Sequence, residues 1–272
     1  MGASSAATSN IDVRTSGSEG VGDAPGGGRG ISSRSAARIM GVLILTGWFT
    51  YGPGAAITDS LVTDPHILAN VAANETTFTV GAVMMLLNSA AVVGIGVIVF
   101  PVLKRHSERV ALGYLATRIL EGAFLAVGVM SLSALTGVTD ARDSVDGATP
   151  ARFEHLAAFA VDLNDLSYQT AMATLGLGSV FLCSLLFRTS LLPRPLAAWG
   201  VIGYGVFAVG MVLDMFGLGV GTVLTVPGGL FELTFATWLI VKGFNPASTE
   251  RTATAISNER LGGKTSSGTA AT

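Results

Sequence analysis

The chain has 272 residues, of which 50% are hydrophobic and 12% charged, and its net charge is −2. Soluble domains carry about 25% charged residues, so the composition excludes an ordinary soluble globular domain. A charge this close to neutral gives no basis for nucleic-acid binding. The single cysteine, Cys183, excludes an intrachain disulfide and a cysteine metal cluster.

The first 37 residues are rich in Gly, Ser and Ala and contain no long apolar stretch. Such a segment buries too little apolar surface to offset the entropy of ordering. We therefore expect residues 1–37 to form a disordered tail, and residues 245–272 to form a second one. An apolar stretch typical of a secretory signal peptide is not predicted in the first 30 residues.

Between these tails the chain divides into six apolar stretches. A helix of about 20 apolar residues spans the hydrocarbon core of a bilayer, and a helix satisfies its own backbone groups in lipid. The sequence therefore predicts an all-α, polytopic transmembrane bundle in one membrane domain, residues 38–244. The six predicted spans are 38–58, 76–101, 109–136, 164–187, 194–217 and 221–242.

Two segments of this domain carry further local signals. Residues 153–160 (FEHLAAFA) are predicted to form a short interfacial helix within the long loop 137–163. Pro227 lies inside the sixth span and is followed by two glycines, which predicts a kink or a break in that helix.

The distribution of Lys and Arg predicts the orientation in the membrane. Loops with excess Lys and Arg remain cytoplasmic, and 13 basic residues flank one side of the predicted spans against Arg142 and Arg152 on the other. We therefore expect both termini in the cytoplasm (N-in and C-in). The 13 are Arg14, Arg29, Arg34, Arg38, Lys104, Arg105, Arg109, Arg188, Arg194, Lys242, Arg251, Arg260 and Lys264.

Four polar side chains fall near the middle of the predicted spans. Arg118 and Glu121 are separated by three residues in the third span and therefore share one helix face. Asn88 and Glu232 are the midpoints of the second and sixth spans. Because ionisable groups in lipid are costly, such residues are by default candidates for an ion, proton or ligand site. A purely structural cluster that fixes helix register is the other interpretation.

Three more polar residues lie toward the predicted outer face. Asp165 and Gln169 share a stripe of the fourth span, and Asp214 lies near the outer end of the fifth. These three residues are predicted to line an outer vestibule, with solvated helix ends as the alternative.

The sequence does not contain the residues that several kinds of chemistry require. There is no HExxH pair, no phosphate-binding loop and no intramembrane His that could ligate haem. The sequence therefore predicts no catalytic residue, no metal and no cofactor, although a lipid-modifying enzyme with Glu121 or Glu232 as general base stays a lesser alternative.

Five stretches resemble a bacterial family of six-helix membrane proteins catalogued as domain of unknown function 4386. They are ARIMGVL (37–43), DPHILANVAANE (64–75), residues 93–122, residues 175–203 and FELTFATWLIVKGFN (231–245). The resemblance implies the same helical fold and a place in the bacterial inner membrane. It implies no catalytic residues, because the family has no assigned activity.

Two functions fit these observations best. The first is a small transporter or proton-linked permease that moves a small solute or a proton through the buried Arg and Glu cluster. The second is a non-catalytic membrane partner or sensor. The expected surroundings are the lipid bilayer, while a protein partner and the oligomeric state are left open.

Overall fold

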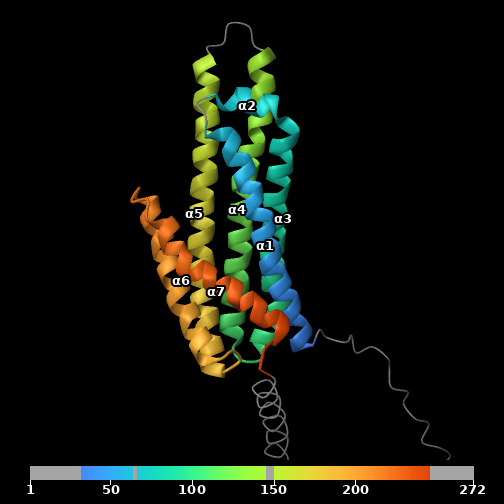
Figure 1. Cartoon of the computed structure of the whole chain (residues 1–272), viewed down its shortest axis with the longest axis vertical. Coiled ribbons are helices and arrows are strands. Elements are labelled where there is room, and N and C mark those ends of the chain that lie inside the picture. The colour runs from blue at the N-terminus through green and yellow to red at the C-terminus, as the bar shows by residue number, and fades with distance from the viewer. Residues whose placement is uncertain (1–31, 64–65, 145–149, 246–272) are drawn as a thin grey trace, which may run out of the picture. The chain divides into compact units, whose positions relative to one another are not determined.

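The computed structural model describes residues 32–63, 66–144 and 150–245, and in these ranges all regular structure is helical (Figure 1). The predicted tails lie outside the described residues for 1–31 and 246–272. The helices are α1 (Ser33–Val62), α2 (Ile67–Ala73), α3 (Glu75–Lys104), α4 (Glu108–Ser144), α5 (Pro150–Thr189), α6 (Arg194–Met215) and α7 (Gly221–Val241).

Six of these helices are long and apolar enough to cross a membrane: α1, α3, α4, α5, α6 and α7. The short helix α2, which the sequence analysis did not predict, connects the first two of them. This confirms the predicted all-α fold with six spans, the architecture of a multi-pass membrane protein.

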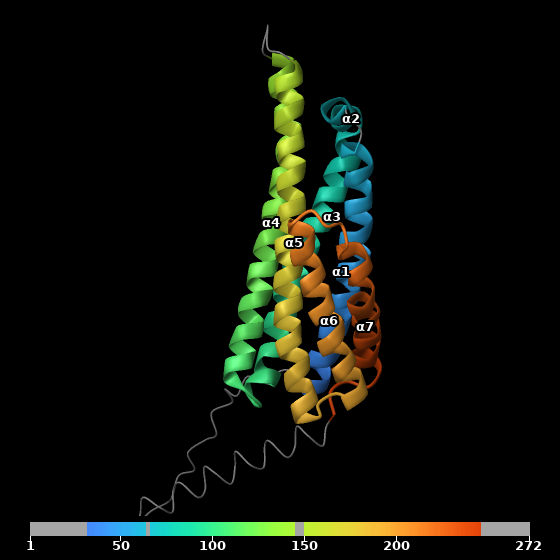
Figure 2. The same cartoon turned by 90° about the vertical axis from the view of Figure 1, so that its left-hand side faces the viewer.

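The six long helices form a closed ring. Each packs against the next one along the chain, and α7 packs against α1. Figure 2 shows α6 and α7 beside the lower half of α5 and α1. Because every long helix has two neighbours in the ring, the side chains on its inner face meet those of the other helices near a common centre.

Glycines allow the closest helix contacts in the ring. A Cβ atom on Gly41 of α1 would lie 2.7 Å from the carbonyl oxygen of Ala236 in α7, and one on Gly54 would lie 2.8 Å from that of Gly81 in α3. Real Cβ atoms do not approach so closely, so larger residues at these positions would force α1 away from both neighbours. Small residues are the usual means of close packing between membrane helices.

The predicted interfacial helix at 153–160 is wrong as a separate element. Helix α5 runs without interruption from Pro150 to Thr189, and α4 likewise continues to Ser144. Ala157 is fully buried and Ala160 nearly so, so this part of α5 packs as a helix against its neighbours rather than lying on the membrane. With 37 and 40 residues, α4 and α5 exceed the roughly 20 that a span needs.

Two further boundaries differ from the prediction. Helix α1 begins at Ser33, before the predicted start at 38, because the side chain of Ser32 accepts a hydrogen bond from the Ser35 N–H and caps the helix. Helix α7 is continuous through Pro227, so the predicted break is absent. Gly203 of α6 lies against the carbonyl group of Pro227, which places α6 directly beside this part of α7.

Candidate functional site

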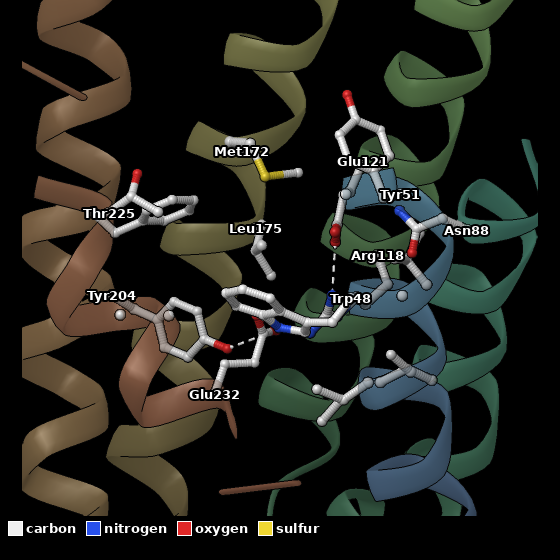
Figure 3. Close-up of a pocket in the computed structure, with 18 of the residues that line it drawn as sticks. Trp48, Tyr51, Asn88, Arg118, Glu121, Met172, Leu175, Tyr204, Thr225 and Glu232 are labelled. Atoms are coloured by element: carbon white, nitrogen blue, oxygen red, sulfur yellow. Dashed lines mark hydrogen bonds and ion pairs between the residues drawn. The ribbon is translucent and has the colours of Figure 1, made fainter. Parts of the chain in front are cut away.

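The ring encloses a cavity of about 290 Å³ that is lined by all six long helices. The four polar residues that the sequence placed near mid-membrane, Asn88, Arg118, Glu121 and Glu232, all line it (Figure 3). They come from α3, α4 and α7. The structure therefore brings these four residues together in one place.

Arg118 and Glu121 form a buried ion pair. Nη1 of Arg118 donates to Oε2 of Glu121 at 2.9 Å, and Nε of Arg118 donates to the hydroxyl of Tyr114 at 2.8 Å. The two charged residues are only 3% and 1% exposed. One turn of α4 thus holds a guanidinium together with its counter-ion and a neutral acceptor, which is how a buried charge is tolerated.

Glu232 is held differently, by two neutral donors. The indole Nε1 of Trp48 donates to Oε2 of Glu232 at 3.1 Å, and the hydroxyl of Tyr204 donates to Oε1 at 3.2 Å. Among the described residues, no basic side chain lies within 4.0 Å of this carboxylate. Two neutral dipoles therefore hold this carboxyl group, and no cation among the described residues contacts it directly.

Asn88 is a further polar group of the cavity wall. The side chain is 7% exposed, and its amide makes no hydrogen bond with any described residue. It faces Gly47 of α1, where a Cβ atom would lie 2.7 Å from Oδ1 of Asn88. Because amides away from bulk solvent are normally hydrogen-bonded, this amide can bind water or a polar group of a ligand in the cavity.

Aromatic side chains make up much of the remaining wall: Trp48, Tyr51, Tyr168, Tyr204 and Phe207. Tyr51 of α1 stacks on Tyr168 of α5, with ring centroids 5.4 Å apart and an angle of 15° between the ring planes. The sequence did not identify Trp48, Tyr51, Tyr168 and Tyr204 as site residues. Trp48 and Tyr204 carry a polar tip within an apolar span, and this signal could have identified them as partners of a carboxylate in another span.

The residues predicted to form the outer vestibule do not reach this cavity. Asp214 accepts a hydrogen bond from the backbone N–H of Gly221 at 2.8 Å, so it ties the end of α6 to the start of α7. Asp165 is exposed and Gln169 is half-buried. It is Tyr168, the neighbour of Gln169, that lines the cavity.

Within the described ranges, the His, Cys, Asp and Glu side chains form no group of three or more that could hold a metal ion. The arrangement offers instead a neutral ion pair, one carboxylate without a counter-ion, a free amide and a set of aromatic rings. Chemically, these groups can bind a proton or a small polar or cationic ligand in an apolar setting.

The comparisons with known proteins bear on the family. No curated protein and no solved structure matches the chain. The family described as "Domain of unknown function (DUF4386)" matches residues 39–243, which cover the six long helices from the first turns of α1 to the end of α7. The chain belongs to this DUF4386 family.

Proposed function

We propose that this protein is a small permease in which the central cavity binds a small solute or a proton and Glu232 is the group that couples binding to movement. The observation that carries the proposal is the state of Glu232. Its carboxylate lines a cavity at membrane depth and has hydrogen-bond donors, while the described part of the chain places no cation within 4.0 Å of it. An intramembrane carboxylate that is not neutralised within the protein favours a transient ligand, a proton or a cation.

The second support is that the site differs from a purely structural cluster. Arg118 and Glu121 satisfy each other, as expected for groups that fix helix register. Within the described residues, Glu232 forms no ion pair with a basic side chain, and the amide of Asn88 forms no hydrogen bond with Glu232. Both side chains nevertheless line the same cavity. The hydrogen bonds of Glu232 join three helices, but a neutral acceptor could do the same, and an ionisable one at this depth favours a functional role.

The direct test is uptake by proteoliposomes that contain the purified full-length protein. The panel of labelled solutes would include an amino acid, a sugar, a carboxylic acid and an organic amine, each with and without an imposed pH gradient. We expect accumulation of one of these classes, its loss in Glu232→Gln, and normal uptake in Glu108→Gln. Glu108 is the control because it is an exposed acid that pairs with Lys104 at 3.0 Å, away from the cavity.

Two outcomes would contradict the permease. One is the absence of both solute uptake and proton flux in the wild type. The other is uptake that Glu232→Gln leaves unchanged.

We also propose that the protein lies in the inner membrane of a bacterium with both termini in the cytoplasm. The support is the excess of basic residues at the connections α3–α4 and α5–α6 and beside the N-terminal end of α1 and the C-terminal end of α7. Cys183 is the only cysteine and is buried, so introduced cysteines report topology cleanly. A membrane-impermeant maleimide should label Asp140→Cys in intact spheroplasts and Ser35→Cys only after lysis, and the reverse pattern would overturn this orientation.

A membrane partner or sensor is the second candidate. It is favoured by the length of α4 and α5, which continue past the other helices in Figure 1. Near the ends of these extensions, Arg142 of α4 lies 4.0 Å from Glu154 of α5. Cross-linking in native membranes from a cysteine placed at position 140 would test it, and recovery of the protein without a second component would argue against it.

A further inference from the structure

We propose that the ligand of the central cavity is a lipophilic organic monocation, an amine or quaternary ammonium group attached to a small apolar body. The inference rests on the proposed function only in treating the cavity as a ligand site. It adds the chemical class of the ligand and the groups that recognise each part of it.

The charge of the cavity wall favours a cationic ligand. The positive charge of Arg118 is paired with Glu121 at 2.9 Å, so these two residues contribute no net charge. Glu232 is the remaining carboxyl group among the residues that line the cavity, and no basic side chain of the described residues lies within 4.0 Å of it. In its ionised form, Glu232 therefore gives the cavity wall one negative charge without a direct counter-ion. A bound cation would complete this charge balance, whereas an anion would add to the unpaired negative charge.

The aromatic residues around Glu232 also favour a cationic ligand. Trp48 and Tyr204 both donate a hydrogen bond to this carboxylate, so both side chains lie beside it (Figure 3). A cation beside Glu232 would therefore also lie near two electron-rich rings. Aromatic rings next to a carboxylate are the chemistry by which proteins recognise ammonium groups, and Trp gives the strongest cation–π interaction.

The remaining residues of the cavity wall fit a hydrated metal ion less well than an organic cation. Calcium and magnesium require about six or more oxygen ligands or bound waters, and the described residues contain no group of three or more His, Cys, Asp or Glu side chains that could hold a metal ion. Beyond the polar groups the wall is formed by apolar residues such as Val92, Ile95, Met172 and Leu175. This surface suits the apolar body of an organic ligand, and about 290 Å³ lies near the lower end of volumes found for small-molecule pockets.

The route into the cavity supports a lipophilic ligand. Two α1 residues of the wall are exposed, Trp48 with 42% of its surface and Gly52. The end of the Trp48 ring lies against Gly229 of α7. Trp48 thus lies between the cavity and the outer surface where α1 faces α7 within the apolar span, and a ligand that dissolves in the bilayer would enter there by displacing the Trp48 ring.

The experiment measures equilibrium binding of radiolabelled benzyltrimethylammonium to the purified full-length protein in nanodiscs. Unlabelled competitors compare the cation with neutral N-benzylacetamide and with anionic phenylacetate, which share its aromatic ring. We expect saturable binding that the unlabelled cation displaces at least tenfold more effectively than either competitor. Absence of binding, or equal displacement by the neutral or the anionic compound, would overturn the proposal.

Variants assign the binding to the proposed groups. Glu232→Gln should weaken binding of the cation at least tenfold, and Trp48→Leu several-fold, while Trp48→Phe should retain a ring and most of the affinity. Glu108→Gln is the control that should bind like the wild type. Gel filtration and thermal unfolding verify that each variant is folded, and the comparison of competitors on the wild type decides the question even if a variant does not fold. Binding that Glu232→Gln leaves unchanged would overturn the assignment.

This measurement separates the ligand class from the permease. Binding of the cation without uptake into proteoliposomes would contradict the permease and support the cation site. Uptake of another solute class by a protein that does not bind the cation would keep the permease and remove the cation site.

Discussion

The two carboxylates of the cavity provide an internal comparison, because they are the same residue type at similar depth in different surroundings. Glu121 is 1% exposed and paired with a guanidinium from its own helix, whereas Glu232 joins α7 to α1 and α6 through neutral donors. The first arrangement is complete without a ligand, and the second leaves a charge unbalanced. The difference indicates that helix stability depends on Glu121 and that ligand binding depends on Glu232.

The largest expected effect is the loss of stability in Glu121→Gln. This change leaves the buried guanidinium of Arg118 without its counter-ion, and breaking such a pair costs about 3–5 kcal/mol. Glu232→Gln removes hydrogen bonds between helices, which are worth only about 0.6–2 kcal/mol each in membrane proteins. Thermal unfolding in detergent would compare the two variants, and equal losses of stability would contradict the proposed difference between the two carboxylates.

The second prediction compares the tyrosines that serve each carboxylate site. Tyr114→Phe removes the acceptor of the Arg118 Nε–H group, and the loss of a hydrogen bond to a buried charged group costs about 1.5–3 kcal/mol of stability. Tyr204→Phe removes one of two donors to Glu232 and should cost about 0.6 kcal/mol. Denaturation curves of both variants test the ranking. A larger loss for Tyr204→Phe would show that Glu232, not Arg118, anchors the cluster.

The third prediction concerns Gly47, which faces the amide of Asn88. A Cβ atom in Gly47→Ala would lie 2.7 Å from Oδ1 of Asn88, and this side chain can rotate into the cavity to relieve the contact. We expect a stability loss below about 1 kcal/mol, less than overpacking of a rigid core costs, but several-fold weaker binding of benzyltrimethylammonium. Gly52→Ala is the matched control, because it lines the same cavity and a Cβ atom there meets nothing within 4 Å.

The smallest expected effect lies outside the membrane, at His106 between α3 and α4. Burial, followed by the charge of Arg105, lowers the pKa of His106 from 6.5. The unfolded chain therefore takes up this proton at a higher pH than the folded protein does. The stabilising contribution is complete above pH 6.5 and is lost as the pH falls below it. Thermal unfolding at about pH 7.5 and about pH 5.5 should show a slightly smaller pH dependence in His106→Gln than in the wild type.

The six spans and the polar cluster could be predicted from the sequence, because both depend on depth along single helices. Apolar length identifies a span, and counting residues from its ends places Asn88, Arg118 and Glu232 at similar depth. Which face of a helix points inward depends on its neighbours. This is why Gln169 could be assigned to a predicted outer vestibule from its stripe, whereas Tyr168 was not predicted to line the central cavity.

Other features depend on contacts that no local pattern records. The hydrogen bond from Trp48 to Glu232 joins residues 184 positions apart, and it exists because α7 closes the ring against α1. Asp214 was interpreted as a vestibule group, but an acidic residue near a helix end also caps the next helix, which is its observed contact. The length of α4 and α5 was underestimated because their extensions are more polar than a membrane span and are stabilised by packing against each other.

The spacing of Arg118 and Glu121 has a consequence for biogenesis. A translocating chain presents its helices to the bilayer in order, and α7, which carries Glu232, emerges last. An arginine at the centre of an isolated span costs about 2.5–3.5 kcal/mol on insertion. Because Glu121 is one turn away on the same helix and binds Arg118 at 2.9 Å, α4 carries its own counter-ion into the membrane. Its charge is already compensated when insertion begins, before the helices that complete the ring have been synthesised.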